Sequence, residues 1–118
     1  MGRIDTRIRE YVRKYVMSRS PGMYILLGRV INKQLGMDPV EAVIRKPKEL
    51  LEALKNFYGD DMEAVFVFRS LFLKPLALMA GNPDLDDELY KAAMKGCPEL
   101  VKALKSYGVS INEDVCGE

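Results

Sequence analysis

One segment of the chain, residues 62–80, is apolar on almost every side and therefore constrains the fold more than any other. Its sequence is MEAVFVFRSLFLKPLALMA, in which Glu63, Arg69, Lys74 and Pro75 are the interruptions. A membrane span needs about 20 nearly uninterrupted apolar residues, so these interruptions argue against insertion into a bilayer. A helix that is apolar all round is expected to lie inside a protein, surrounded by other elements. The segment is therefore predicted to be the axis of a helical domain.

Prolines and glycines divide the rest of the chain into helix-sized intervals, because proline favours the start of a helix and glycine favours the residue after its end. Helices are predicted at about residues 4–17, 21–35, 39–46, 47–58, 85–95 and 98–107, and four of them begin with proline. Ser20 is predicted to cap the second helix. Gly28, inside that helix, predicts a close helix crossing. Pro75 is predicted to kink or divide the central helix.

The predicted fold is all-α, a single compact domain of six or seven short helices packed orthogonally around the central apolar helix. Within this domain, residues 1–81 are predicted to form a core bundle and residues 82–112 a helical hairpin docked on it. Residues 113–118 are predicted to be a frayed tail. Val65 to Phe68 alone would suit a strand, but no partner strand is apparent in the sequence.

The residue types present narrow the chemistry of the chain. Histidine is absent and the only cysteines are Cys97 and Cys116, which removes most zinc, haem and catalytic-triad arrangements. We therefore expect no enzyme and no cofactor, and we assign no catalytic, cofactor-binding or metal-ligating residue. The two cysteines are expected to be free thiols in a reducing cytosol. A disulfide stays open as an alternative, because intracellular disulfides occur in hyperthermophiles and the low Asn and Gln content favours such a source.

Acidic residues cluster at two predicted helix starts, at residues 60–63 and 84–88. The second run has some of the character of a calcium loop, but it lacks the required glycine, and Lys95 stands where the terminal glutamate would be. Negative charge at a helix N-terminus complements the helix dipole, and both clusters are interpreted in that way. A catalytic carboxylate pair is the weaker alternative.

Positive charge is concentrated in the first half of the chain. Residues 1–50 hold eleven Lys or Arg and five acids, whereas residues 51–118 hold seven and twelve. The first helix is amphipathic and basic, and its candidate contacts to an anionic partner are Arg7, Arg9, Arg13 and Lys14, with Arg3 and Arg19 flanking them. Such a helix could contact phosphates. A solvated polar face is the commoner explanation, and Tyr11 and Tyr15 are predicted to face the core.

Residues 29–46, RVINKQLGMDPVEAVIRK, have the spacing of a helix-turn-helix. Glu41 and Ala42 stand near the start of the would-be recognition helix, where side chains that read bases are expected, and Pro47 limits its length. Ordinary helix packing is therefore the favoured interpretation of this segment, and DNA recognition is the alternative.

Arg69 is the most unusual residue of the central helix, because its position points it toward an expected apolar environment. It is a candidate anion or partner contact, and it would lie at the mouth of a ligand pocket if the helices enclose one. The alternative is an arginine without a binding role, whose side chain extends past its neighbours so that its charge reaches solvent. The methionines on apolar faces are predicted to fill the core: Met23, Met37, Met62, Met79 and Met94.

Two parts of the chain resemble known families. Residues 22–81 resemble an archaeal module, the Nitrosopumilus-type output domain, in the apolar stretch MYILLGRVINKQLGM, the proline-led LEALKNFYG segment and the following EAVFVFRSLFL helix. This resemblance implies an archaeal, noncatalytic sensing, output or interaction role. Residues 88–112, ELYKAAMKGCPELVKALKSYGVSIN, are similar to a single ankyrin repeat. A lone repeat cannot bury its own face, so it must dock on the preceding helices.

These observations lead to two functional expectations. The first is a noncatalytic, regulatory protein-interaction module that associates with a protein partner or with itself through exposed apolar surface. The second is a DNA- or RNA-binding protein that uses the basic first helix and residues 29–46. The start of the chain has no signal-peptide pattern and no segment reads as a membrane span, so a cytoplasmic location and no membrane partner are expected.

Overall fold

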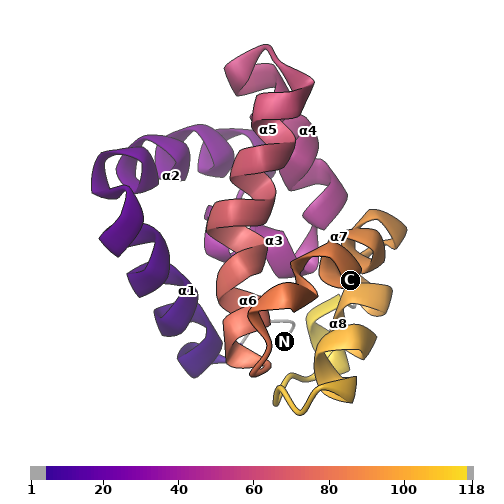
Figure 1. The fold of residues 1–118 in the computed structure, drawn as a ribbon. Helices are drawn as coiled ribbons and strands as arrows, with labels where there is room; N and C mark the ends of the chain where they lie inside the picture. The colour runs from indigo at the N-terminus through magenta and orange to yellow at the C-terminus, as the bar shows by residue number, and fades with distance from the viewer. Residues whose placement is uncertain (1–4, 117–118) are drawn as a thin grey trace.

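The computed structural model describes residues 5–116, and every regular element within that range is helical, with no strand. The α-helices are α1 (Thr6–Arg19), α2 (Pro21–Leu35), α3 (Pro39–Arg45), α4 (Pro47–Tyr58), α5 (Asp61–Val67), α6 (Lys74–Met79), α7 (Asp86–Lys95) and α8 (Cys97–Ser106). A π-helical turn (Phe68–Leu73) joins α5 to α6, and 3₁₀ turns cover Pro83–Leu85 and Glu113–Cys116. Because α5, the π-helical turn and α6 form one continuous rod, the described chain has seven helices (Figure 1). The predicted all-α fold is confirmed.

Local chemistry explains most of the helix ends. The predicted proline starts are observed at the first or second position of α2, α3, α4 and α8, at Pro21, Pro39, Pro47 and Pro98. Gly36 and Gly59 end α2 and α4 with φ of +74° and +70°, a conformation that strains other residues. Ser20 is the N-cap residue of α2 as predicted, although its side chain makes no capping hydrogen bond. The prediction of a close helix crossing at Gly28 is wrong, because no neighbouring atom lies within 4 Å of the position that a Cβ would occupy there.

The central rod passes through the middle of the molecule. Helices α1 and α2 lie on one side of it, α3 and α4 pack behind it, and α7 and α8 lie on the other side (Figure 1). Its buried side chains are Ala64, Phe68, Phe72, Leu73, Leu76 and Ala77, none of which has measurable exposure. The rod is therefore the predicted axis of the core. The prediction that it is enclosed along its whole length is wrong, because α5 exposes 82% of Met62 and 69% of Phe66.

The π-helical turn explains how the rod continues through Pro75. The backbone N–H of Lys74 donates to the carbonyl of Arg69, five residues back, instead of to residue 70. In an α-helix the ring of Pro75 would meet the carbonyl of Leu71, four residues earlier. The wider turn accommodates the ring, so α6 continues the rod of α5. The helix that was predicted to kink or divide at Pro75 changes type there, and α6 begins at Lys74 with Pro75 in its first turn.

The C-terminal residues are packed against the core. Helices α7 and α8 form the predicted hairpin and contact α4 and the π-helical turn through α7. Beyond α8, Val109, Ile111 and Val115 are buried, and Arg45 Nε donates to the carbonyl oxygen of Val115 at 3.2 Å. The predicted fraying is therefore wrong up to residue 116, and residues 117–118 lie outside the described range.

The two cysteines form a disulfide, so the expectation of free thiols is wrong. Cys97, at the start of α8, is bonded to Cys116, with their Cα atoms 5.6 Å apart. Their separation of 19 residues closes a loop that contains α8 and the terminal 3₁₀ turn. The disulfide thus holds the end of the described chain on the hairpin.

Candidate functional site

The basic side chains of α1 are largely used within the fold. Arg9 pairs with Asp38 at 2.8 Å and with Glu41, a residue that is only 5% exposed and that also accepts from Arg45 at 3.0 Å. These contacts fasten α1 to α3. Arg9 is therefore a structural residue rather than a free contact for an anionic partner.

The other basic candidates on α1 are more exposed. Arg13 donates to Glu10 at 2.8 Å, and this hydrogen bond lowers the pKa of the Glu10 carboxyl. The Arg7 side chain is 80% exposed, with its Nε 3.6 Å from a carboxylate oxygen of Asp5, and Lys14 is exposed. Arg3 lies outside the described residues. Arg19, the last residue of α1, is exposed and lies 4.7 Å from the centre of the Tyr15 ring. Besides Arg9, the described part of α1 thus carries four cations, of which Arg7 and Arg13 lie beside acidic residues.

The segment predicted as a helix-turn-helix is folded as α2 and α3, but α3 is enclosed. Every residue of α3 from Pro39 to Ile44 is buried. A recognition helix must present side chains to the major groove. In this structure α3 cannot do so, and ordinary packing, the favoured interpretation, describes the segment.

Arg69 does not lie in the apolar environment predicted for it. Its guanidinium group donates to Asp86 at 3.0 Å and to Asp87 at 3.4 Å, and it lies 5.2 Å from the centre of the Tyr90 ring. Both carboxylates belong to the first turn of α7, the predicted position of dipole-complementing charge. Arg69 therefore joins the central rod to the C-terminal hairpin, with about a third of its side chain still exposed.

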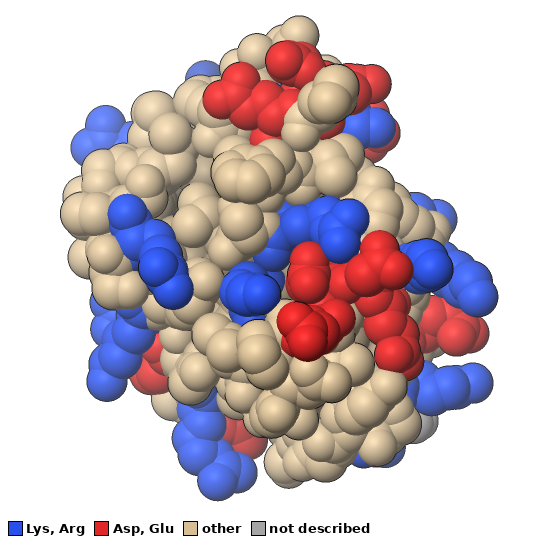
Figure 2. Space-filling model, viewed as in Figure 1, with Lys and Arg blue, Asp and Glu red and all other residues tan. Residues whose placement is uncertain are grey.

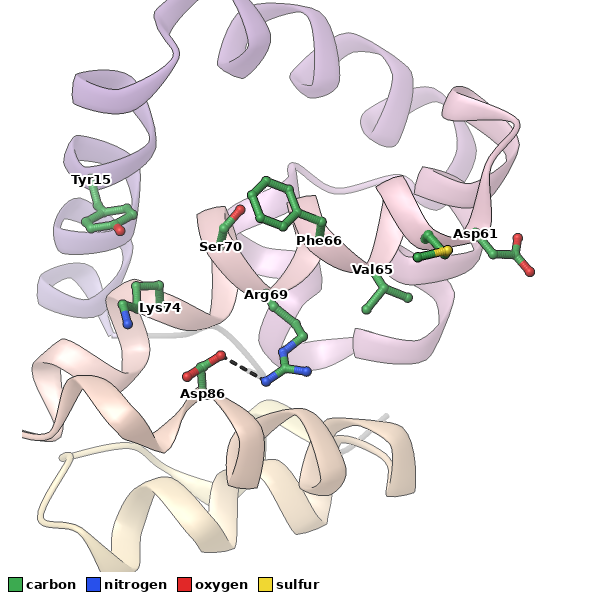
Figure 3. Close-up of a pocket in the computed structure, with 9 residues that line it drawn as sticks. Tyr15, Asp61, Val65, Phe66, Arg69, Ser70, Lys74 and Asp86 are labelled. Carbon is green, nitrogen blue, oxygen red and sulfur yellow. Dashed lines mark hydrogen bonds and ion pairs between the residues drawn. The ribbon is translucent and has the colours of Figure 1, made fainter.

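Beside Arg69 the surface is hollowed into a groove of about 620 Å³ (Figure 3). Its lining residues come from α1, the central rod and α7: Tyr15, Asp61, Met62, Val65, Phe66, Arg69, Ser70, Lys74 and Asp86. Most of the exposed lining is apolar, and the charged residues Asp61 and Lys74 lie toward its two ends with Arg69 between them (Figure 3). We call this feature the α5 groove.

Four of the lining residues, Met62, Phe66, Ser70 and Lys74, follow one another at intervals of four along the rod. Four residues exceed one α-helical turn of 3.6 residues, so such a series drifts around an ordinary helix. The wider π-helical turn at residues 68–73 reduces this drift. As a result, Phe66 and Ser70 point to the same side of the rod (Figure 3).

Charged groups stand at both ends of the α5 groove. Asp60, Asp61 and Glu63 stand at the N-terminal end of α5, where Asp60 caps the helix by accepting from the backbone N–H of Met62 at 2.9 Å. At the other end, Lys74 Nζ donates to the carbonyl oxygen of Pro83 at 3.0 Å. No described carboxylate lies within ion-pair distance of Lys74. Figure 2 shows acidic groups at the top of this face and near the start of α7, with uncharged surface and then basic groups between them.

Sequence reasoning identified Arg69 but missed the rest of the groove. Tyr15 was expected in the core and is only half-buried, while Tyr11 is 41% exposed. Met62 was expected as core filler and is the most exposed large apolar residue described. The signal that could have revealed the groove is the four-residue series ending one residue before Pro75.

The described residues contain no group of three or more His, Cys, Asp or Glu side chains arranged to hold a metal ion. The helices described are all too short or too polar to cross a membrane. Comparison of the chain with protein-family models, curated proteins and solved structures gives no significant match.

Proposed function

We propose that this chain is a noncatalytic protein-interaction module and that its interaction surface is the α5 groove. The observation that carries the proposal is the exposure of Met62 and Phe66, two of the residues that line that groove. Single exposed apolar side chains are ordinary, but two adjacent large ones beside an apolar hollow are typical of a binding site.

The expected energetics favour a protein as the partner. Fully burying a Phe or Met side chain contributes about 1.5–3 kcal/mol, and aromatic residues and Met are enriched at protein interfaces. Here both side chains project outward, so a partner must close over them rather than enter a deep cavity. A macromolecular surface can do this more completely than a small molecule.

The polar groups of the groove support orientation rather than chemistry. Arg69 is already paired with Asp86 and Asp87, and Lys74 is hydrogen-bonded to a backbone carbonyl. Charged groups around an apolar centre exclude solvent from it and set the register of the partner. This division into an apolar centre and a charged margin matches the anatomy of protein interfaces.

Site-specific photocrosslinking tests the proposal. p-Benzoylphenylalanine placed at position 66 in cells that naturally make the protein should yield a covalent adduct with a protein, identified by mass spectrometry. The matched control carries the same group at Tyr107, which is 39% exposed on the C-terminal hairpin and outside the groove. Equal labelling at both positions, or no protein adduct at position 66, would overturn the proposal.

A further inference from the structure

Resting on the proposed function, we infer that the partner in the α5 groove is a second copy of this chain. The two copies pair their α5 helices antiparallel across a two-fold axis that passes between Phe66 and Ser70. In this two-fold arrangement each contact occurs twice: residue i of the first copy contacts residue j of the second, and residue j of the first copy contacts residue i of the second. The inference depends on two kinds of self-complementarity on this face, in shape and in charge.

The shape argument comes from Phe66 and Ser70, which are neighbours on one side of the rod (Figure 3). Phe66 is a large side chain that projects into solvent with 69% of its surface exposed. Ser70 is small and lines the same hollow. The projecting side chain and the hollow lie side by side along the rod. When a second copy is placed antiparallel to the first, the projection of each copy therefore faces the hollow of the other. Phe66 of each copy then fills the space above Ser70 of the other.

The charge argument comes from the ends of the same series. Turning the second copy end for end brings the acidic end of one α5, with Asp61 and Glu63, opposite Lys74 of the other. The carboxylate of Asp86 in the same copy is engaged by Arg69, and Lys74 has no described ion pair. A parallel arrangement would instead place like charges together, which is unfavourable. The charges therefore favour the antiparallel arrangement and reject the parallel one.

A dimer interface of standard size would cover a modest part of this molecule. A standard interface covers about 800 Å² on each partner, which is roughly one eighth of the 6347 Å² accessible surface of this molecule. The face that holds the groove extends from α1 to α7 across the width of the molecule (Figure 2). Met62 and Phe66 both line this groove, and large apolar side chains that a partner buries completely contribute most to binding.

Sedimentation analysis of the full chain over about 1 μM to 1 mM tests the inference. The expected result is a concentration-dependent rise from 13.4 kDa to twice that mass. Phe66→Ala should weaken dimerisation at least tenfold. Lys102→Glu, an exposed charge reversal on α8 outside the groove, should leave it unchanged.

Charge reversal then tests the antiparallel pairing itself. Asp61→Lys and Lys74→Glu should each weaken self-association about tenfold, because each homodimer would contain two like-charge contacts. An equimolar mixture of the two variants should dimerise again, since both contacts in the mixed dimer join opposite charges. The double variant should also dimerise, and circular dichroism should show native helix content for every protein used. Failure of the mixture to recover would overturn the antiparallel arrangement.

A chain that stays monomeric throughout the concentration range overturns the inference. This failure is distinguishable from failure of the proposed function. If position 66 crosslinks to a different protein while the isolated chain is monomeric, the groove is an interaction surface but its partner is not a second copy. If position 66 crosslinks to the same chain, both conclusions stand.

Discussion

Breaking the Cys97–Cys116 disulfide should destabilise the protein by an amount that the loop length sets. The bond joins residues 19 apart. In the chain-entropy model, a loop of this size contributes about 3 kcal/mol by restricting the unfolded chain. For a domain of 118 residues, this corresponds to a fall of about 10 °C in the melting temperature.

The folded structure itself should change little on reduction. Val115 is 1% exposed, and its carbonyl oxygen accepts from Arg45, so two contacts still hold the tail when the covalent bond is absent. The expected loss therefore comes from the unfolded state, in which the freed chain gains conformations. Reduction should lower the urea concentration at the denaturation midpoint. At low urea concentration, the backbone amides of α8 should be protected from hydrogen exchange about as well as in the oxidised protein.

Urea denaturation with and without a thiol-free reductant, alongside Cys116→Ser in both conditions, provides the assay. The reduced protein and the serine variant should agree with each other, and the variant should not respond to reductant. Val115→Ala separates the packing of the tail from the covalent bond, since it leaves the disulfide in place. Identical midpoints for the oxidised and reduced protein, or two titratable thiols before reduction, would refute the reasoning.

Three further perturbations follow from the described contacts. Phe68→Ala, which empties a fully buried position in the rod, should lower the free energy of unfolding by about 3–5 kcal/mol in urea titrations. Glu41→Ala removes the buried carboxylate shared by two arginines and should cost about 2 kcal/mol, less than a fully buried pair because both arginines stay about a quarter exposed. Burial raises the pKa of Tyr24 and Tyr58 above 10.0 in the folded protein. Their contribution to the free energy of unfolding is therefore complete below pH 10 and is lost as the pH rises through their pKa values in the folded state. Unfolding midpoints between pH 8 and 11 should therefore fall less in Tyr24→Phe/Tyr58→Phe than in the parent protein; equal losses would contradict this.

Helix positions were predictable because their causes are local. A proline at the first turn and a glycine at the end act through their own backbone geometry, so Pro39, Pro47, Gly36 and Gly59 mark boundaries whatever surrounds them. The burial of the rod was predictable in its C-terminal half for a similar reason, since a continuous apolar surface has to be covered somewhere.

The groove and its partners depend on packing between distant segments, which no local pattern encodes. The hydrophobic side chain of Phe66 predicts that its burial would be favourable. Whether another residue covers it depends on how far α1 and α7 lie from it in the folded protein. Arg69 likewise appeared unpaired because its carboxylates come from Asp86 and Asp87, 17 and 18 residues later and across a turn. The disulfide was missed because the tail was assigned no contacts that would hold Cys116 near Cys97.

The π-helical turn has a consequence for how this protein tolerates insertions and deletions. It sets the rotational phase between the two halves of the rod, one of which is locked by Leu76 and Ala77 while the other carries Phe66. Because a π-helical turn holds about one residue more than the α-helical turn that it replaces, removing one residue between 68 and 73 would restore an α-helix with Phe66 on nearly the same side of the rod. The ring of Pro75 would then meet the carbonyl oxygen four residues earlier. The extra residue in this turn therefore lets the rod keep its proline without changing the direction in which the exposed aromatic side chain faces.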